Sequence, residues 1–203
     1  MPTFDLRGIK IGKYNFEDGV VSYETPVKMG DAIRVELNIA TAEGRLYAES
    51  RLAEYKKLVT GGSASVGVKY IPQEAQKIMF DMKESTRTVG ESNKEVTGLK
   101  ISANDIAHYV GMGFYAPDVI DGVDKYTAVF VYKTLFGTPG YVYETKGEGI
   151  AFQTPTTTGE FLADDSAERN IMEIVEVDTA AEAEAWISAC FTAGAGAAAA
   201  ATN

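Results

Sequence analysis

One long alternating stretch, residues 124–136, limits what this chain can fold into. Its aromatic side chains fall on one face of an extended strand, and its Lys, Thr and Val side chains fall on the other. Residues 137–140 contain turn-forming Gly and Pro, and a second extended stretch follows over 141–153. We therefore predict a long hairpin, with arms exceeding the usual strand of about five or six residues. Its aromatic face consists of Tyr126, Phe130, Tyr132 and Phe136.

The composition indicates one soluble domain with a sizeable core. The chain has 203 residues, of which 45% are hydrophobic and 24% are charged, as is usual for a globular protein. No apolar run approaches the roughly 18 residues that a membrane-spanning helix needs, so we expect no membrane contact. The N-terminal residues lack a basic region followed by an apolar core, so we expect no secretory signal and a protein made and kept in the cytoplasm.

The charge distribution argues against a surface that grips nucleic acid. The formal net charge is −10, whereas tight binding to DNA draws on Lys and Arg side chains that neutralise phosphates. Residues 144–184 hold 11 acidic and 2 basic residues, so the acidic character belongs to one segment. That segment is either a solvated face or a wall to which nucleic acid does not stick.

The remaining pattern predicts mostly strands, with two helices. Pro72 suits the first turn of a helix over 72–82, and Thr179 with Glu182 forms a capping box that begins a second helix. Residues 83–105 are polar and lack periodicity, which predicts a long loop with at most a short strand. Strands are expected at 20–23, 32–40, 61–70, 108–116 and 171–177. The apolar face of the second helix consists of Ala183, Trp186, Ile187 and Cys190.

The ends of the chain differ from its middle. Residues 1–27 are turn-rich and could form an N-terminal arm that reaches a neighbouring subunit. Residues 193–203 consist mostly of Ala and Gly with no patterned apolar face, which predicts a flexible tail. We therefore expect a single domain over residues 1–192.

No constellation of residues indicates catalysis. If His108 were the general base of a hydrolytic site, the site would also need an orienting acid and a nucleophile, and the sequence contains no Gly-x-Ser-x-Gly motif. A structural role for His108 is therefore the better interpretation. Cys190 lies on the apolar side of its predicted helix, which is typical of a core residue, and as the only cysteine it cannot form an internal disulfide or a thiolate zinc site. We expect the protein not to be an enzyme.

Two further patterns have a structural and a functional interpretation. Asp118, Asp121 and Asp124 could offer oxygens to a calcium ion, but they lack the alternating spacing of a calcium-binding loop and are better explained as turn residues. Gly111 and Gly113 are too few for a dinucleotide-binding fingerprint. In a strand they predict the close approach of another backbone or a bulky ring. We expect no metal and no cofactor.

Four short segments and the second helix together carry a family resemblance. The segments are LYAESRLAE at 46–54 before Gly61-Gly62, HYVGMGFY at 108–115, YTAVFVYKT at 126–134 and IAFQTPT at 150–156. With the closing helix and its Trp186, this order resembles the major tail proteins that form the tail tube of long-tailed bacteriophages, the siphoviruses. The resemblance covers roughly residues 28–190, and residues 83–105 have no counterpart in it.

The resemblance implies a fold and a set of partners. The fold would be a β-dominated α+β structure, a β-sandwich or half-barrel with one packed helix, a second C-terminal helix and long hairpin arms. Copies of the chain would form stacked, hexameric rings in the virion tail after assembly in the host cytoplasm. Other partners would be the tape measure, tail terminator and distal tail proteins, with DNA passing through the lumen without tight binding.

The predicted hairpin supplies the candidate residues for such an assembly. We expect one face of it to contact a neighbouring subunit or to line the lumen. A β-barrel or sandwich that binds a small molecule or a sugar is the main alternative, and it would need a closed apolar cavity within one chain. The candidate residues are Lys125, Thr127, Val129, Val131, Lys133, Glu144, Lys146 and Glu148.

Overall fold

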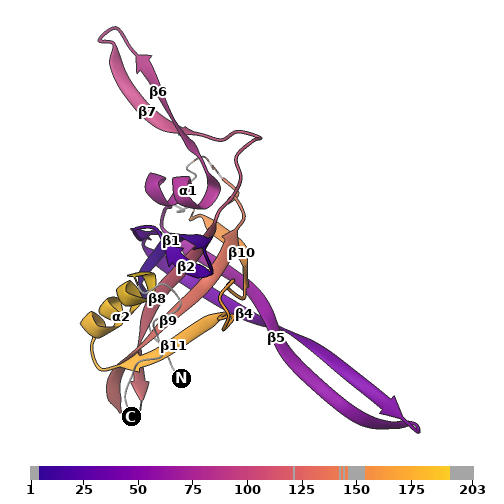
Figure 1. Cartoon of the computed structure of the whole chain (residues 1–203). Coiled ribbons are helices and arrows are strands. Elements are labelled where there is room, and N and C mark those ends of the chain that lie inside the picture. Colours follow the sequence, from indigo (N-terminus) through magenta and orange to yellow (C-terminus); the bar gives the residue numbers. More distant parts are fainter. Residues whose placement is uncertain (1–4, 121, 142, 144, 146–153, 193–203) are drawn as a thin grey trace.

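The computed structural model describes residues 5–120, 122–141, 143, 145 and 154–192. Strands dominate it and two helices accompany them, so the fold is β-dominated α+β (Figure 1). The strands are β1 (Arg7–Glu17), β2 (Val20–Tyr23), β3 (Val27–Lys28), β4 (Ala32–Ala48), β5 (Arg51–Val68), β6 (Lys83–Val89), β7 (Lys94–Lys100), β8 (Tyr109–Ile120), β9 (Val123–Phe136), β10 (Thr156–Leu162) and β11 (Met172–Val177). The helices are α1 (Gln73–Phe80) and α2 (Ala180–Thr192).

One antiparallel sheet organises the body of the molecule. Its strand order is β2-β1-β8-β9-β10-β5-β4, with β3 pairing with β1. Strand β9 is long enough to pair with β11 over Tyr126 to Val131 and with β10 over Lys133 to Phe136, both along its second edge. The sheet therefore branches at β9, and β6 and β7 form a separate two-stranded sheet.

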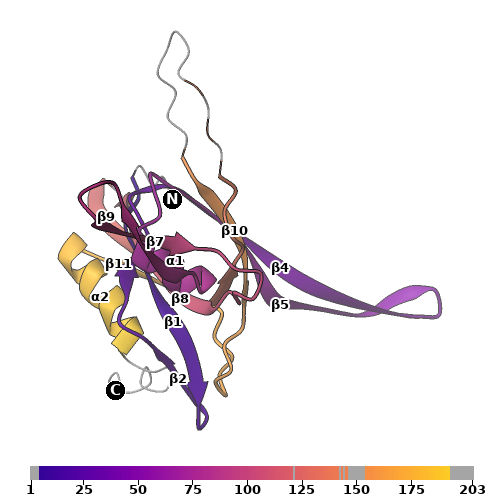
Figure 2. The ribbon, with the colours of Figure 1, turned by 90° about the horizontal axis from the view of Figure 1, so that it is seen from above.

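Two apolar layers lie on opposite faces of β8 and β9. The inner layer packs β1, β5, β8, β9 and β10 around α1, and its fully buried side chains include Met79, Met112 and Val131. The outer layer lies under α2, where Ala183, Ile187 and Phe191 are buried. In both views α2 lies beside β8 and β11, away from the hairpin formed by β4 and β5 (Figures 1 and 2).

A bulge in β9 separates the predicted aromatic face into two groups. Val110 pairs with Thr134 but Met112 pairs with Val131, so Gly111 alone opposes two residues of β9. An extra residue reverses the alternation of side chains beyond it. The prediction of a single aromatic face was therefore wrong. Tyr126, Phe130 and Tyr132 pack under α2, whereas Phe136 is buried in the inner layer.

The expectation for the two glycines of β8 is confirmed. A Cβ atom at Gly111 would lie 2.5 Å from Cε1 of Tyr23, and one at Gly113 would lie 2.5 Å from Cγ2 of Ile187. Both distances are too short for real carbon atoms. The glycines therefore let an aromatic ring and helix α2 approach the backbone of the central strand.

The two predicted helices are present. In α2 the backbone N–H of Glu182 donates to Thr179 Oγ1 at 3.2 Å, and the backbone N–H of Thr179 donates to Glu182 Oε2 at 3.0 Å. This reciprocal pair is the capping box expected from the sequence. Helix α1 is shorter than the predicted 72–82 and ends at Phe80, where Asp81 adopts a left-handed conformation (φ 55°).

Two sequence-based expectations differ from the structure, and a third is described only in part. The first arm of the predicted hairpin, β9, pairs with β8 through a turn at Gly122 and, on its other edge, with β10, the next described strand. Most of its expected partner stretch, 141–153, lies outside the described residues. The 83–105 segment contains the hairpin of β6 and β7 where we expected a loop. Within residues 1–27, β1 pairs with β8 inside the sheet, and Ile9 and Ile11 are fully buried, so this strand is not an arm.

Candidate assembly surfaces

The hairpin of β4 and β5 extends far beyond the body (Figures 1 and 2). The two strands pair from Ala32 with Val68 to Ala48 with Arg51. Glu49 and Ser50 both have positive φ angles, 50° and 64°, as a two-residue hairpin turn of type I′ requires. Strand β10 pairs with β5 only from Gly61 to Gly67. Within the described chain, no third strand supports residues 41–60, which we call the arm.

One face of the arm carries a network of charges and a tyrosine. Glu43 lies opposite Lys57 and beside Arg45, with N–O distances of 3.4 and 3.2 Å. The Arg45 guanidinium lies over the ring of Tyr55, 5.6 Å from its centroid. A hydrogen bond to Glu43 raises the pKa of the Tyr55 hydroxyl. Ion pairs between side chains as exposed as these contribute little to stability. The network therefore orients the side chains on this face and adds little to the pairing of the two strands.

Large apolar side chains lie on both faces of the arm with little cover. Each is roughly half exposed, between 49% and 61%. A two-stranded hairpin is marginally stable in water at best, and exposed strand edges invite pairing with other chains. The arm therefore has the properties of a segment that is completed by a partner. These side chains are Leu46, Tyr47, Tyr55, Leu58 and Val59.

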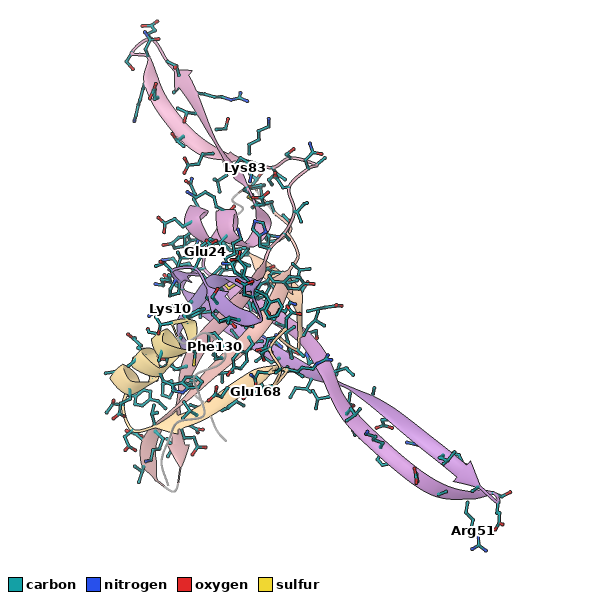
Figure 3. The ribbon with its side chains drawn as sticks, viewed as in Figure 1. Lys10, Glu24, Arg51, Lys83, Phe130 and Glu168 are labelled. Carbon is teal, nitrogen blue, oxygen red and sulfur yellow. The ribbon has the colours of Figure 1, made fainter. Side chains whose placement is uncertain are left out.

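The arm also differs from the rest of the chain in charge. Residues 41–60 contain four basic and three acidic residues, a net charge of +1, whereas the remaining residues sum to −11. Figure 3 shows the basic Arg51 at the far tip of the arm. The net charge of the arm is therefore opposite in sign to that of the rest of the chain.

The hairpin of β6 and β7 is a second projection, on another side of the body (Figure 1). It pairs from Lys83 with Lys100 to Val89 with Lys94. A salt bridge from Lys77 of α1 to Glu84, at 2.8 Å, links its base to the body. Val89 and Val96 are both 46% exposed near the tip. This hairpin, too, projects beyond the core.

The candidate residues of the predicted hairpin lie mostly inside the chain's own structure. Val129 and Val131 are buried in the inner layer. Lys125 forms an ion pair with Asp178, and Thr127 lies beside the groove described below. Glu144, Lys146 and Glu148 lie outside the described residues.

Lys133 has a structural environment of its own. Its Nζ lies 2.5 Å from Asp165 Oδ2 and over the rings of Tyr14 and Tyr109, 5.0 and 4.7 Å from their centroids. Hydrogen bonds from Lys133 and from the hydroxyl of Tyr14 lower the pKa of the Asp165 carboxyl. The lysine therefore joins β9 to the loop between β10 and β11.

The other residues considered as candidates from the sequence, His108, Cys190 and Asp118, are held by contacts within the fold. The backbone N–H of His108 donates to the carbonyl of Met79 at 3.0 Å, and its Nε2 lies 3.5 Å from Asp81 Oδ1. Burial raises the pKa of the Cys190 thiol to about 12, so its nucleophilic thiolate is scarce at neutral pH. Asp118 is buried and accepts a hydrogen bond from the N–H of Val119 at 2.8 Å.

No group of three or more His, Cys, Asp or Glu side chains in the part of the chain that the structure describes could hold a metal ion. None of the helices in the described ranges has the length and apolar character needed to cross a membrane.

Comparison of the chain with protein-family models found no match, and comparison with curated proteins found none either.

Proposed function

We propose that the protein is a structural subunit that assembles with copies of itself into stacked rings, the tail tube of a long-tailed bacteriophage. The observation that carries the proposal is the arm. It continues a buried sheet for about 25 to 30 Å past the body, at roughly 3.3 Å for each residue. Its apolar side chains are half exposed on both faces. A monomer that worked alone would gain nothing from such an extension, and it would risk aggregation.

Two projections in different directions suit a tube. In a ring, neighbouring subunits contact each other head to tail through two different surfaces. The ring closes when the rotation that relates one subunit to the next is a whole-number fraction of a full turn. A stack of rings needs a second contact along the tube axis. The arm and the hairpin of β6 and β7 leave the body on different sides (Figure 1). They therefore supply separate surfaces for these two contacts.

Removing the arm should abolish assembly without unfolding the body. Ala40 pairs with Gly61, so an Asn-Gly turn in place of residues 41–60 closes a shorter hairpin with the same register. Size-exclusion chromatography with light scattering and negative-stain microscopy measure the result. We expect rings or tubes from concentrated parent protein and monomers from the shortened chain.

Thermal melting separates assembly from folding in this experiment. The shortened chain should keep a cooperative transition, because none of the arm's described side chains belongs to either buried layer. A parent protein that stays monomeric at high concentration, even with tail-initiating partners added, counts against the proposed function.

The outer face of β4, β5 and β10 within the body is polar and suits a wall past which DNA slides. Glu36 pairs with Ser65, and Ser63 pairs with both Asn38 and Glu160. The only basic residue in this group, Arg34, lies 2.5 Å from Glu36 and is neutralised by it. The wall is made of Arg34, Glu36, Asn38, Ser63, Ser65 and Glu160.

The protein should not bind DNA tightly. With a net charge of −10 it has few uncompensated cations to release counterions from the phosphates. Fluorescence anisotropy with labelled duplex DNA at physiological salt should give a dissociation constant weaker than about 1 μM, the tighter limit of non-specific binding. Tighter binding that weakens steeply with salt would favour a nucleic-acid-binding protein.

The packing of the sheet interior favours a structural subunit over a barrel that binds a ligand. The layer enclosed by the strands is filled by large side chains such as Met112, Phe136 and Phe161. A pocket of about 310 Å³ does occur, but it lies at the edge of α1, between Tyr70, Gln76 and Tyr141. This position is outside the sheet interior that a barrel would use for a ligand.

A further inference from the structure

The inner layer of the body opens into a groove on the side away from α1. Its volume is about 300 Å³, and its floor consists of Val35, Phe114 and Val129. Leu6 and Ile33 form one side of it, with Asp5 and Arg34 nearby. We call this feature the mouth groove.

Strand β11 extends the mouth groove on its second side. Ile174 pairs with Val129, and Glu176 pairs with Thr127. Cross-strand partners point to the same face of a sheet, so Ile174 and Glu176 border the groove. Ile33 and Ile174 are 55% and 56% exposed, which leaves apolar surface open on both borders.

One polar atom in the groove lacks a partner. Thr127 Oγ1 is buried, and no described group forms a hydrogen bond with it. A buried hydroxyl without a partner costs about 1 to 3 kcal/mol. An occupant that brings a hydrogen-bonding group, such as a tyrosine hydroxyl, removes this cost.

We propose that the mouth groove of one subunit receives the arm of a second copy of this chain, an inference that rests on the proposed function. The arm presents Tyr47, which is 61% exposed and combines an apolar ring with a hydroxyl that can form a hydrogen bond to a buried polar atom. Its net charge is +1, and the groove is bordered by Glu176 of the acidic segment.

The arm in the groove comes from another copy, because its own chain holds it too far away. Leu46 lies eleven residues along β4 from Val35, which is about 36 Å in an extended strand. The register between β4 and β5 keeps the hairpin extended over that length. The arm and the groove are two different surfaces of the chain. A pair of subunits joined by one contact therefore keeps a free groove on one subunit and a free arm on the other, and each can bind a further copy. Contacts of this kind form a ring when the rotation between neighbouring subunits closes.

The test uses two defective chains that complement each other. The shortened chain lacks the arm but keeps the groove, and Ile33→Asp places a charge in the groove but keeps the arm. Alone, the shortened chain should stay monomeric, and Ile33→Asp should assemble only at a concentration at least about tenfold above that of the parent, a difference of about 1.4 kcal/mol. Mixed in equal amounts, they should form a one-to-one heterodimer that grows no further, seen by light scattering.

Val20→Asp is the matched control for Ile33→Asp. Val20 is also 55% exposed but lies on β2 opposite Glu17, at the end of β1 away from Leu6 and the groove. It should assemble like the parent, and Ile174→Asp should fail like Ile33→Asp. If the parent and Ile33→Asp assemble equally well while the shortened chain does not, the arm binds elsewhere; this inference is overturned and the proposed function stands. A parent that never assembles overturns both.

Discussion

Replacing Phe130 by Ala is expected to lower the free energy of unfolding by about 3 to 5 kcal/mol. The ring is fully buried under α2. It packs edge to face against Tyr23, Tyr132 and Phe191, with centroid distances of 5.6, 5.2 and 4.9 Å. Its loss leaves a cavity among three rings that are fixed by other contacts. Urea unfolding followed by circular dichroism measures the change, against a total stability of about 5 to 15 kcal/mol.

Two comparison variants make this result specific. Trp186 is only partly buried on the same helix, so Trp186→Ala should cost less than Phe130→Ala. Val20→Ala, at an exposed position, should change stability by no more than about 0.5 kcal/mol. A larger loss from Trp186→Ala would mean that the packing of the outer layer depends more on the tryptophan than on Phe130.

Local signals in the sequence predicted the helices well. The capping box of Thr179 and Glu182 depends on two residues three positions apart, so distant parts of the chain have little influence on whether it forms. Ala183 and Ile187 are buried as their helical spacing predicted. The glycines of β8 were also interpretable, because a strand with Gly111 and Gly113 on one face lacks side chains where something else must pack.

Strand partners were harder to predict, because pairing depends on distant residues. The turn residues between 137 and 140 predicted that the chain folds back onto β9, and β10, the next described strand, does pair with it; the pairing of its other edge with β8 was not predicted. The bulge opposite Gly111 could not be found from β9 alone, since the alternation of aromatic residues continues through it unchanged.

The resemblance implied long hairpin arms, but the positions of the two projecting hairpins were missed for a related reason. Strand patterns are recognised by one apolar and one polar face, which a core imposes. The arm has no core beside it, and both of its faces mix apolar and charged residues. The predicted strand ended at residue 40, whereas β4 runs on through Gly44 to Ala48. The pattern of the arm is therefore not one that a core within the same chain imposes.

Replacing Asp164 by Ala is expected to lower the free energy of unfolding by about 2 to 5 kcal/mol, because one buried oxygen of Asp164 accepts the hydrogen bonds that hold the loop between β10 and β11 in place. Asp164 is 3% exposed. Its Oδ1 accepts hydrogen bonds from the N–H of Ser166 at 3.2 Å, from Ser166 Oγ at 2.6 Å and from the N–H of Asn170 at 2.9 Å. Alanine removes this acceptor and leaves two partly buried N–H groups without it, each at about 1 to 3 kcal/mol.

The conservative substitution Asp164→Asn tests whether the acceptor itself is responsible. Asparagine keeps an oxygen at the Oδ1 position, so most of the stability should return in urea unfolding. The loop also presents Asp165 to Lys133 and Tyr14, and Asp164→Ala should therefore loosen the packing of β9 as well. Equal losses from the two substitutions would show that the negative charge matters and that the hydrogen-bond acceptor does not, because asparagine retains the acceptor and lacks the charge.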